Sequence, residues 1–205
     1  MSKNPDPDRD LVLACQASPA EGLDGPFQEL YERFKDRVYS VCYRITGNPT
    51  DALDASQETF GTLYRKVGDF RFQSRFSSWV YRIAVNASID LQRRSRTRRL
   101  ASLDAFRDNN HGSGDHGFDI HDEAVEMPSA TASRHELEDE IQRAISRLSP
   151  KLSAITVLRY VQNLSYDEIA ETLQISLGTV KSRLARAHAA LDRELSPVLD
   201  KHYLG

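Results

Sequence analysis

A run of arginines is the first feature of this chain that could do chemistry. Five arginines and no acidic residue lie between Leu91 and Leu100, whereas the segment from Asp104 to Glu126 holds seven acidic residues and one base. Arginines bind phosphate groups, and an acidic segment repels them. Because the net charge of the chain is only −3, this pattern predicts a phosphate contact in one segment and argues against a generic polyanion binder.

A second candidate site is a pair of short helices between Ser165 and Leu195. The residues Ser165-Tyr166-Asp167-Glu168 fit a capping box, in which the first and fourth residues satisfy each other's backbone amides at the start of a helix. A tight link, Gln174-Ile175-Ser176, precedes a second helix, which Ser176 is well placed to cap. This arrangement is typical of a DNA-binding helix-turn-helix.

The second of these helices has the amphipathic pattern that reading a major groove requires. At about 100° per residue, its small and polar side chains point away from its apolar stripe. Lys181 and Arg186 suit guanine edges or phosphates, and Ser182 suits a base edge or a phosphate. A solvated basic helix packed on a bundle is the alternative interpretation. The apolar stripe consists of Val180, Leu184, Ala187, Leu191 and Leu195, and the opposite face of Ser182, Ala185, Arg186 and Ala189.

Acidic residues gather near the start of a helix in the first half of the chain. Asn48 fits the N-cap and Pro49 the first helical position. Asp51 and Asp54 follow within the next turns, where the helix dipole favours negative charge. An exposed acidic face also suits a basic partner helix, although a merely well-capped helix would show the same residues.

The elements that position these residues are predicted to be helices throughout. Apolar residues recur every three or four positions over residues 26–47, 48–68 and 74–99 and again after residue 133, and Ser74 can cap the third helix. No strand-like alternation is present. We therefore expect an all-α chain of two small helical domains, with three main helices in the first and four in the second.

Composition divides the chain into segments. The polar, Gly-rich stretch 109–117 cannot bury enough apolar surface to offset the entropy of ordering. We therefore interpret residues 1–25 as a flexible N-terminal arm, 26–99 as the first domain, 100–133 as a flexible acidic linker, 134–196 as the second domain and 197–205 as a tail.

Several classes of protein are disfavoured by what the sequence lacks. It has no apolar run of about 18 residues and no secretory signal, so we expect a cytoplasmic protein without membrane insertion. Cys15 and Cys42 make no disulfide framework, and Cys42 has the spacing of a core residue. His111, His116 and His121 lack cysteine or helical partners, so we predict neither a metal site nor a cofactor. No Walker loop or nucleophile motif accompanies the carboxylates, so we do not expect an enzyme.

Both halves resemble one family, the extracytoplasmic-function (ECF) sigma factors of the sigma-70 family, which are specificity subunits of bacterial RNA polymerase. Residues 164–170 and 178–187 resemble the region 4 motif of that family. Residues 51–60 are similar to region 2.2 and residues 76–86 to regions 2.3 and 2.4. The resemblance implies a sigma factor that binds core polymerase and directs promoter recognition, −10 melting and transcription initiation.

The resemblance also implies partners and site residues. The acidic helix would dock on the β′ clamp helices of core RNA polymerase, with a second contact at the β flap, and an anti-sigma factor is an expected regulator. The link before the third helix would capture an unstacked base of the −10 element, and the helix-turn-helix would read the −35 element. The implied polymerase-binding residues are Asp51, Asp54, Gln57, Glu58 and Phe60; those for −10 DNA are Phe70, Arg71, Phe72, Gln73, Arg82, Asn86, Arg93, Arg94 and Arg96; and those for −35 DNA are Ser165, Thr179, Lys181, Ser182, Arg183, Ala185 and Arg186.

Three alternatives stay open from the sequence. For one of Phe70 and Phe72, hydrophobic closure of the end of the helical bundle would explain the side chain without any DNA contact. Trp79 is interpreted as a core residue rather than a base-stacking one. The alternative function is a helix-turn-helix regulator that binds duplex DNA without polymerase, because a helix-turn-helix by itself does not identify the class of regulator.

Overall fold

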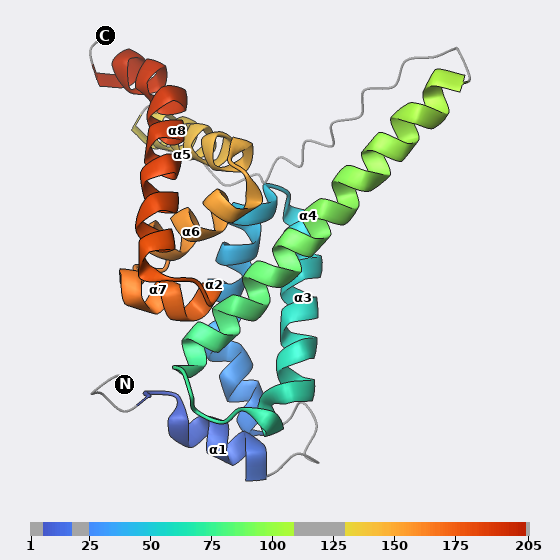
Figure 1. The fold of residues 1–205 in the computed structure, drawn as a ribbon, viewed down its shortest axis with the longest axis vertical. Helices are drawn as coiled ribbons and strands as arrows, with labels where there is room; N and C mark the ends of the chain where they lie inside the picture. The colour runs from blue at the N-terminus through green and yellow to red at the C-terminus, as the bar shows by residue number, and fades with distance from the viewer. Residues whose placement is uncertain (1–5, 18–24, 109–129, 204–205) are drawn as a thin grey trace.

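The computed structural model describes the backbone of residues 6–17, 25–108 and 130–203, with their side chains except those of residues 96, 98–108, 130–135 and 197–203. Every regular element within these ranges is a helix (Figure 1), which confirms the all-α prediction. The helices in chain order are α1 (Arg9–Ala17), α2 (Pro26–Thr46), α3 (Pro49–Lys66), the short 3-10 helix η1 (Val67–Asp69), α4 (Phe76–Asp108), α5 (Ala130–Arg147), α6 (Pro150–Tyr160), α7 (Tyr166–Leu173) and α8 (Leu177–Tyr203).

Helices α2, α3 and α4 pack on one another and form the first half of the molecule. Their core contains large, fully buried side chains such as Phe34, Leu63 and Phe76. Cys42 is also fully buried, and burial raises the pKa of its thiol to about 11. Cys42 is therefore a core residue, as the spacing of apolar residues predicted.

The turn between α2 and α3 follows the local signals in the sequence. Gly47 ends α2 in the left-handed region, with a φ of 70°, and its amide donates to the Tyr43 carbonyl. Glycine reaches this region without a steric penalty. The side chain of Asn48 then accepts a hydrogen bond from the amide of Asp51 at 3.0 Å, and Pro49 opens α3. The predicted cap and helix start are thus confirmed.

Helices α6, α7 and α8 form the second half, with α5 packed against α6 and α8. Its core contains Ile155, Leu158, Ile169 and Leu184, all of which are buried almost completely. This small core fixes the angle between α7 and α8, which is the geometry that a helix-turn-helix requires.

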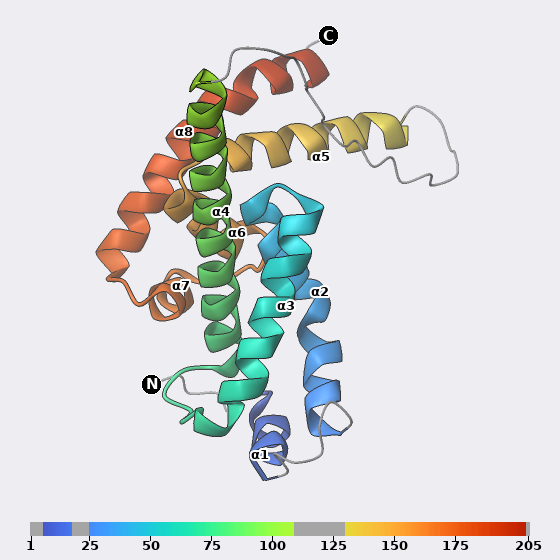
Figure 2. The same cartoon turned by 90° about the vertical axis from the view of Figure 1, so that its right-hand side faces the viewer.

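The two halves contact each other directly. Helices α5 and α6 lie against α2, and α7 lies against α4 (Figure 2). The side chain of Gln142, which is buried, accepts a hydrogen bond from Arg44 at 3.0 Å. A Cβ atom at Gly47 would lie 3.3 Å from the Cβ of Ser146, so the missing side chain permits this close approach. Both predicted helical domains are present, and these contacts, which the sequence did not predict, bring them together.

Three segment boundaries also differ from the prediction. Part of the proposed N-terminal arm is α1, and its Val12 and Cys15 are buried in the first core. Helix α4 continues to Asp108 and α5 begins at Ala130, so both enter the segment interpreted as a linker. Helix α8 continues to Tyr203 through the segment interpreted as a tail. Residues 100–108 contain neither glycine nor proline, which explains why the helix does not stop at Arg99.

Candidate nucleic-acid interface

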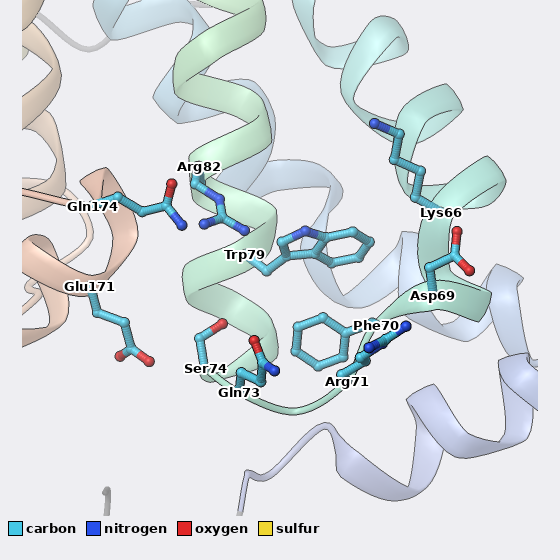
Figure 3. A pocket seen from close by; sticks show the side chains of 10 residues that line it. All are labelled: Lys66, Asp69, Phe70, Arg71, Gln73, Ser74, Trp79, Arg82, Glu171 and Gln174. Carbon is cyan, nitrogen blue, oxygen red and sulfur yellow. The ribbon is translucent and has the colours of Figure 1, made fainter.

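Residues 67–75, which include η1, join α3 to α4 and are called the link below. A cavity of about 460 Å³ lies beside this link. Figure 3 shows the ring of Phe70 beside the indole of Trp79, with Arg82 above them on α4 and the side chains of Glu171 and Gln174 facing them from the end of α7. These groups combine an aromatic surface, a cation and amide hydrogen-bonding groups, which suit an unstacked nucleobase.

The structure brings four of the predicted −10 residues together in this cavity. Phe70, Arg71, Gln73 and Arg82 all contribute to its walls. Phe72 is not among the lining residues, and its ring packs on that of Phe70 at 5.0 Å between ring centroids. The cavity also includes residues that sequence reasoning missed or assigned to the core, namely Lys66, Asp69, Ser74, Trp79, Glu171 and Gln174.

An aromatic cluster supports the cavity from within the first core. The ring of Phe70 lies 5.3 Å from that of Phe76 and 5.0 Å from the indole of Trp79. Phe70 is only 9% exposed, so it closes the end of the bundle and only a small part of it lines the cavity. Trp79 is half-buried and lines the cavity. Its interpretation as a core residue is therefore incomplete, because part of the indole surface faces outward.

From Arg82, which lines the cavity, helix α4 carries polar side chains onward toward its C-terminal end. Arg82, Asn86 and Arg93 lie within about 40° of one another around the helix axis at 100° per residue. Asn86 and Arg94 are exposed, and Arg93 is exposed beside Asp90, with 3.2 Å between the charged atoms. Of the predicted phosphate contacts, Arg93 therefore shares the face of Arg82 and Asn86, whereas Arg94 is exposed about 100° away around the axis. The side chain of Arg96 lies outside the described residues.

The helix-turn-helix forms as predicted and is held by short-range bonds. Ser165 and Glu168 make both hydrogen bonds of the capping box at the start of α7. Gln174 then takes a left-handed conformation, with a φ of 53°. The hydroxyl of Ser176 accepts a hydrogen bond from the amide of Thr179 at 3.1 Å and caps α8.

Helix α8 presents the predicted reading face to solvent. Lys181, Ser182, Ala185 and Arg186 are exposed, whereas Val180, Leu184 and Ala187 are buried. Thr179 and Arg183 are half-buried at its edge. Ser165 is exposed, but its hydroxyl is engaged with the carboxylate of Glu168 at 2.8 Å. Small side chains between cations leave room for a groove edge to approach the helix.

Glu168 links the helix-turn-helix to the first half of the molecule. Its carboxylate lies 2.9 Å from the guanidinium of Arg75, which immediately precedes α4. The pKa of Glu168 is lowered, chiefly by the hydrogen bond from the backbone of Ser165. Burial opposes this shift, and the Ser165 hydroxyl and the charge of Arg75 lower the pKa further. Helix α7 thus places Glu168 against Arg75, while Glu171, on the same helix, lines the cavity.

The acidic face of α3 lies apart from the cavity. Asp54, Gln57 and Glu58 are exposed and Asp51 is half-buried. Phe60 differs from its predicted role as a contact residue, because it is 8% exposed and its ring packs against Tyr31 at 4.7 Å between centroids. The phenylalanine supports this surface from beneath. The exposed apolar groups beside the carboxylates are Tyr31, Leu53 and Tyr64, which the charge pattern did not indicate.

Comparison with known proteins assigns the chain to a family. Residues 30–99 match the family model Sigma-70 region 2, and residues 138–191 match Sigma-70, region 4. The ECF RNA polymerase sigma factor SigW of Bacillus subtilis is 34% identical over 178 residues, which cover 85% of this chain and 91% of SigW. The chain belongs to the ECF sigma factors. It therefore directs promoter-specific transcription initiation by RNA polymerase, and the alternative of a regulator that acts without polymerase is disfavoured.

A second relative supports the same assignment, and two solved structures share the fold. The RNA polymerase sigma-H factor of Pseudomonas aeruginosa is 33% identical over 193 residues, covering 94% of this chain and 95% of the relative. Among solved structures, that of CnrH in complex with the cytosolic domain of CnrY has a TM-score of 0.63 at 24% identity, covering 93% of this chain and 97% of that one. The sigma factor RpoE of Bartonella quintana, in complex with the anti-sigma factor NepR, has a TM-score of 0.60 at 20% identity, covering 83% of this chain and 96% of that one. At these identities the solved structures show a shared fold.

Two further observations concern the described part of this ECF sigma factor. None of its helices within residues 6–17, 25–108 and 130–203 is long and apolar enough to span a bilayer. Within the same ranges, no group of three or more histidine, cysteine or carboxylate side chains could hold a metal ion. The three histidines considered as metal ligands, His111, His116 and His121, lie outside the described residues.

Proposed function

We propose that this ECF sigma factor captures a −10 base in the cavity beside the α3–α4 link, reads the −35 element with α8 and binds core polymerase through the acidic face of α3. Arg82, Asn86 and Arg93 would continue the −10 contact along α4. Lys181, Ser182 and Arg186 would contact −35 bases or backbone. The acidic face would dock on the β′ clamp helices, and the second half would contact the β flap. The site of action would be the cytoplasm, and no catalytic role is proposed for any side chain.

The cavity carries this proposal. It is the place among the described residues where aromatic, amide and cationic side chains converge at the end of an exposed polar helix face. A base that enters it can stack on Trp79 and donate to or accept from Gln73, while phosphates follow the cations of α4. Base stacking on an aromatic ring contributes roughly 1–3 kcal/mol, which is enough to offset part of the cost of unpairing one base.

The packed arrangement of the two halves suggests how the protein is controlled. Glu171, which lines the cavity, would repel a DNA phosphate, because like charges at short range oppose one another. We infer that the packed form is the one without DNA, and that the second half moves aside when a promoter binds. The related sigma factor RpoE was solved with an anti-sigma factor. A partner of that kind, which holds the packed form, is proposed for this chain.

Run-off transcription tests the proposal directly. The full chain is mixed with core polymerase and a promoter library randomised at both elements, and the transcribed templates are sequenced. Selected templates should share two separated motifs. Failure to bind core polymerase or to produce any promoter-dependent transcript would refute the proposed function.

Charge reversal on α3 separates the polymerase contact from the DNA contacts. Asp54→Lys should weaken binding of core polymerase at least about tenfold, because it places a cation opposite a basic partner, while the affinity of the isolated chain for a −35 duplex stays unchanged. Asp10→Lys, an exposed acidic residue on α1, is the control for net charge. Equal loss of both activities in Asp54→Lys would contradict the assignment of this face.

A further inference from the structure

The segment Asp6–Gln16 lies along the link that shapes the cavity, and it precedes the residues that match the Sigma-70 region 2 family model. Figure 1 shows α1 beneath the start of α4, beside η1. Helix α1 contacts both α2 and η1. Val12 is fully buried and Cys15 nearly so, so this segment shares the core of the first half.

The link has backbone carbonyls whose partner comes from α1. The amide nitrogen Nε2 of Gln16 donates to the carbonyl of Val67 at 2.9 Å and to that of Phe70 at 2.8 Å. A carboxamide has two N–H donors, and both are used here. A single side chain thus fixes two points of an irregular segment, on either side of the turn that directs Phe70 into the aromatic cluster.

The start of α4 is capped from the same segment. The backbone amide of Phe76 donates to Oδ2 of Asp6 at 2.6 Å, and Oδ1 of Asp6 accepts from the amide of Asp8 at 3.1 Å. A carboxylate at a helix N-terminus satisfies a free amide and interacts favourably with the helix dipole. Ser74 was predicted to cap α4, but its hydroxyl donates to the carbonyl of Arg75 at 3.4 Å. The cap therefore comes from a residue that is distant in sequence.

A third contact, between Arg9 and Phe72, stabilises a residue of the link that has an unfavourable backbone conformation. Phe72 has a φ of 53°, which is uncommon for an aromatic residue. The guanidinium of Arg9 lies over its ring, 4.4 Å from the centroid, in the geometry of a cation–π contact. Asp8 is 5% exposed and pairs with Arg33 of α2 at 2.8 Å, which anchors the segment that carries Arg9.

We propose that the segment Asp6–Gln16 is a brace that sets the shape of the base-capture cavity, with Asp6, Arg9 and Gln16 as positioning residues for −10 recognition. None of the three is among the residues that line the cavity. They act through the link, whose residues do. This inference rests on the function proposed for the cavity.

The expected effect of the brace is preorganisation. A link that already has the binding conformation loses less conformational entropy when a base enters the cavity. Removal of a brace contact should therefore weaken base capture and reduce the preference for the correct base. It should leave the helix-turn-helix and the acidic face of α3 unaffected, since the polar contacts of the brace described above go to the link, the start of α4 and α2.

The test uses the full chain in reconstituted holoenzyme on a promoter selected by the wild-type protein. Promoter melting is followed by the fluorescence of 2-aminopurine placed in the −10 element, and discrimination by comparing the selected −10 base with its three replacements. The variants are Gln16→Met, which keeps side-chain length but removes both donors, and Asp6→Ala. Gln28→Met and Asp36→Ala, at exposed positions on α2 outside both the brace and the link, are the matched controls.

Gln16→Met should weaken melting about tenfold, equivalent to roughly 1.4 kcal/mol, and should lower discrimination at one −10 position by a similar factor. Asp6→Ala should have a similar effect, and both controls should behave as wild type. Binding of core polymerase and of a −35 duplex should be unchanged in every variant.

Two outcomes would refute the proposed role of the brace. One is normal melting and discrimination in both brace variants. The other is a proportional loss of melting, polymerase binding and −35 binding together with a lower Tm, which would indicate general destabilisation. Absence of −10-dependent melting in the wild-type holoenzyme would instead refute the function proposed for the cavity, so the two failures are distinguishable.

Discussion

The two DNA-reading regions of this sigma factor are built in different ways. The helix-turn-helix is held by neighbours in sequence: Ser165 bonds with Glu168, Ser176 with Thr179, and Arg159 with the carbonyl of Leu164. The link beside the cavity is held by Gln16 and Asp6, which are 51 to 70 positions away from the groups they bind. A local site is specified by a short motif, whereas the link needs the whole first half to be folded.

The largest expected effects come from breaking each core in turn. Phe76→Ala should cost about 3–5 kcal/mol and Leu184→Ala about 2–5 kcal/mol, because each leaves a cavity in a packed core. The single tryptophan, Trp79, reports on the first half by fluorescence, while circular dichroism reports on both. In urea titrations, Phe76→Ala should shift the fluorescence transition strongly, and Leu184→Ala should shift it much less. Equal shifts in both variants by both probes would show that the halves unfold as one unit.

This difference explains what the sequence could predict. The capping box, the Ser176 cap and the apolar stripe of α8 depend on residues within a few positions of one another, and all three are present as expected. The cap of α4 was assigned to Ser74, the nearest candidate, because the contact of Asp6 depends on the tertiary fold. Phe60 was assigned to a surface because a motif shows residue types but not burial. The contact between Arg75 and Glu168 has no local signal at all.

Next in size is a change on the reading face of the local site. Arg186→Ala should cost about 1–3 kcal/mol at one −35 base pair if the guanidinium reads a base, and should lower the affinity for all sequences equally if it binds phosphate. Binding is measured with holoenzyme on each single-base variant of the −35 element. Arg193→Ala is the matched control, since Nε of both arginines donates to the carbonyl four residues earlier, at 3.4 Å for Arg186 and 3.2 Å for Arg193. An unchanged affinity in Arg186→Ala for every −35 sequence would contradict the role of this face.

A smaller effect is expected at the cap of α7. Ser165→Ala should lower the free energy of unfolding by about 1 kcal/mol. Ser149→Ala is the control, because Ser149 occupies the N-cap of α6 without a side-chain capping bond. A cost of Ser149→Ala as large as that of Ser165→Ala would show that the capping box contributes nothing specific.

The same cap predicts a dependence on pH. The folded-state pKa of Glu168 is lowered from the ordinary value of 4.5, so its contribution to stability is present above that value and is lost as the pH falls through the folded-state pKa. When the pH falls below about 4.5, the ordinary pKa of a glutamate, Glu168→Gln should therefore lose less stability than the wild-type protein does. Glu136→Gln, an exposed position on α5, should not. An unaltered acid transition in Glu168→Gln would exclude this carboxylate as a source of the acid sensitivity.

The smallest effect on stability concerns the contact between the two regions themselves. Arg75 and Glu168 are partly exposed, with side-chain exposures of 35% and 28%, so Arg75→Gln should cost no more than about 1 kcal/mol. Arg75→Gln should change the shape of the chain more than its stability. If a packed and an opened form have similar free energies, a change of 1 kcal/mol alters the ratio of their populations about fivefold. The radius of gyration of the free chain in solution should increase in Arg75→Gln. It should not increase in Arg143→Gln, which breaks an ion pair within α5. If neither variant expands, the contacts of Gln142 and Gly47 suffice to hold the halves together, and control of the packed form must lie at the α2–α5 contact rather than beside the cavity.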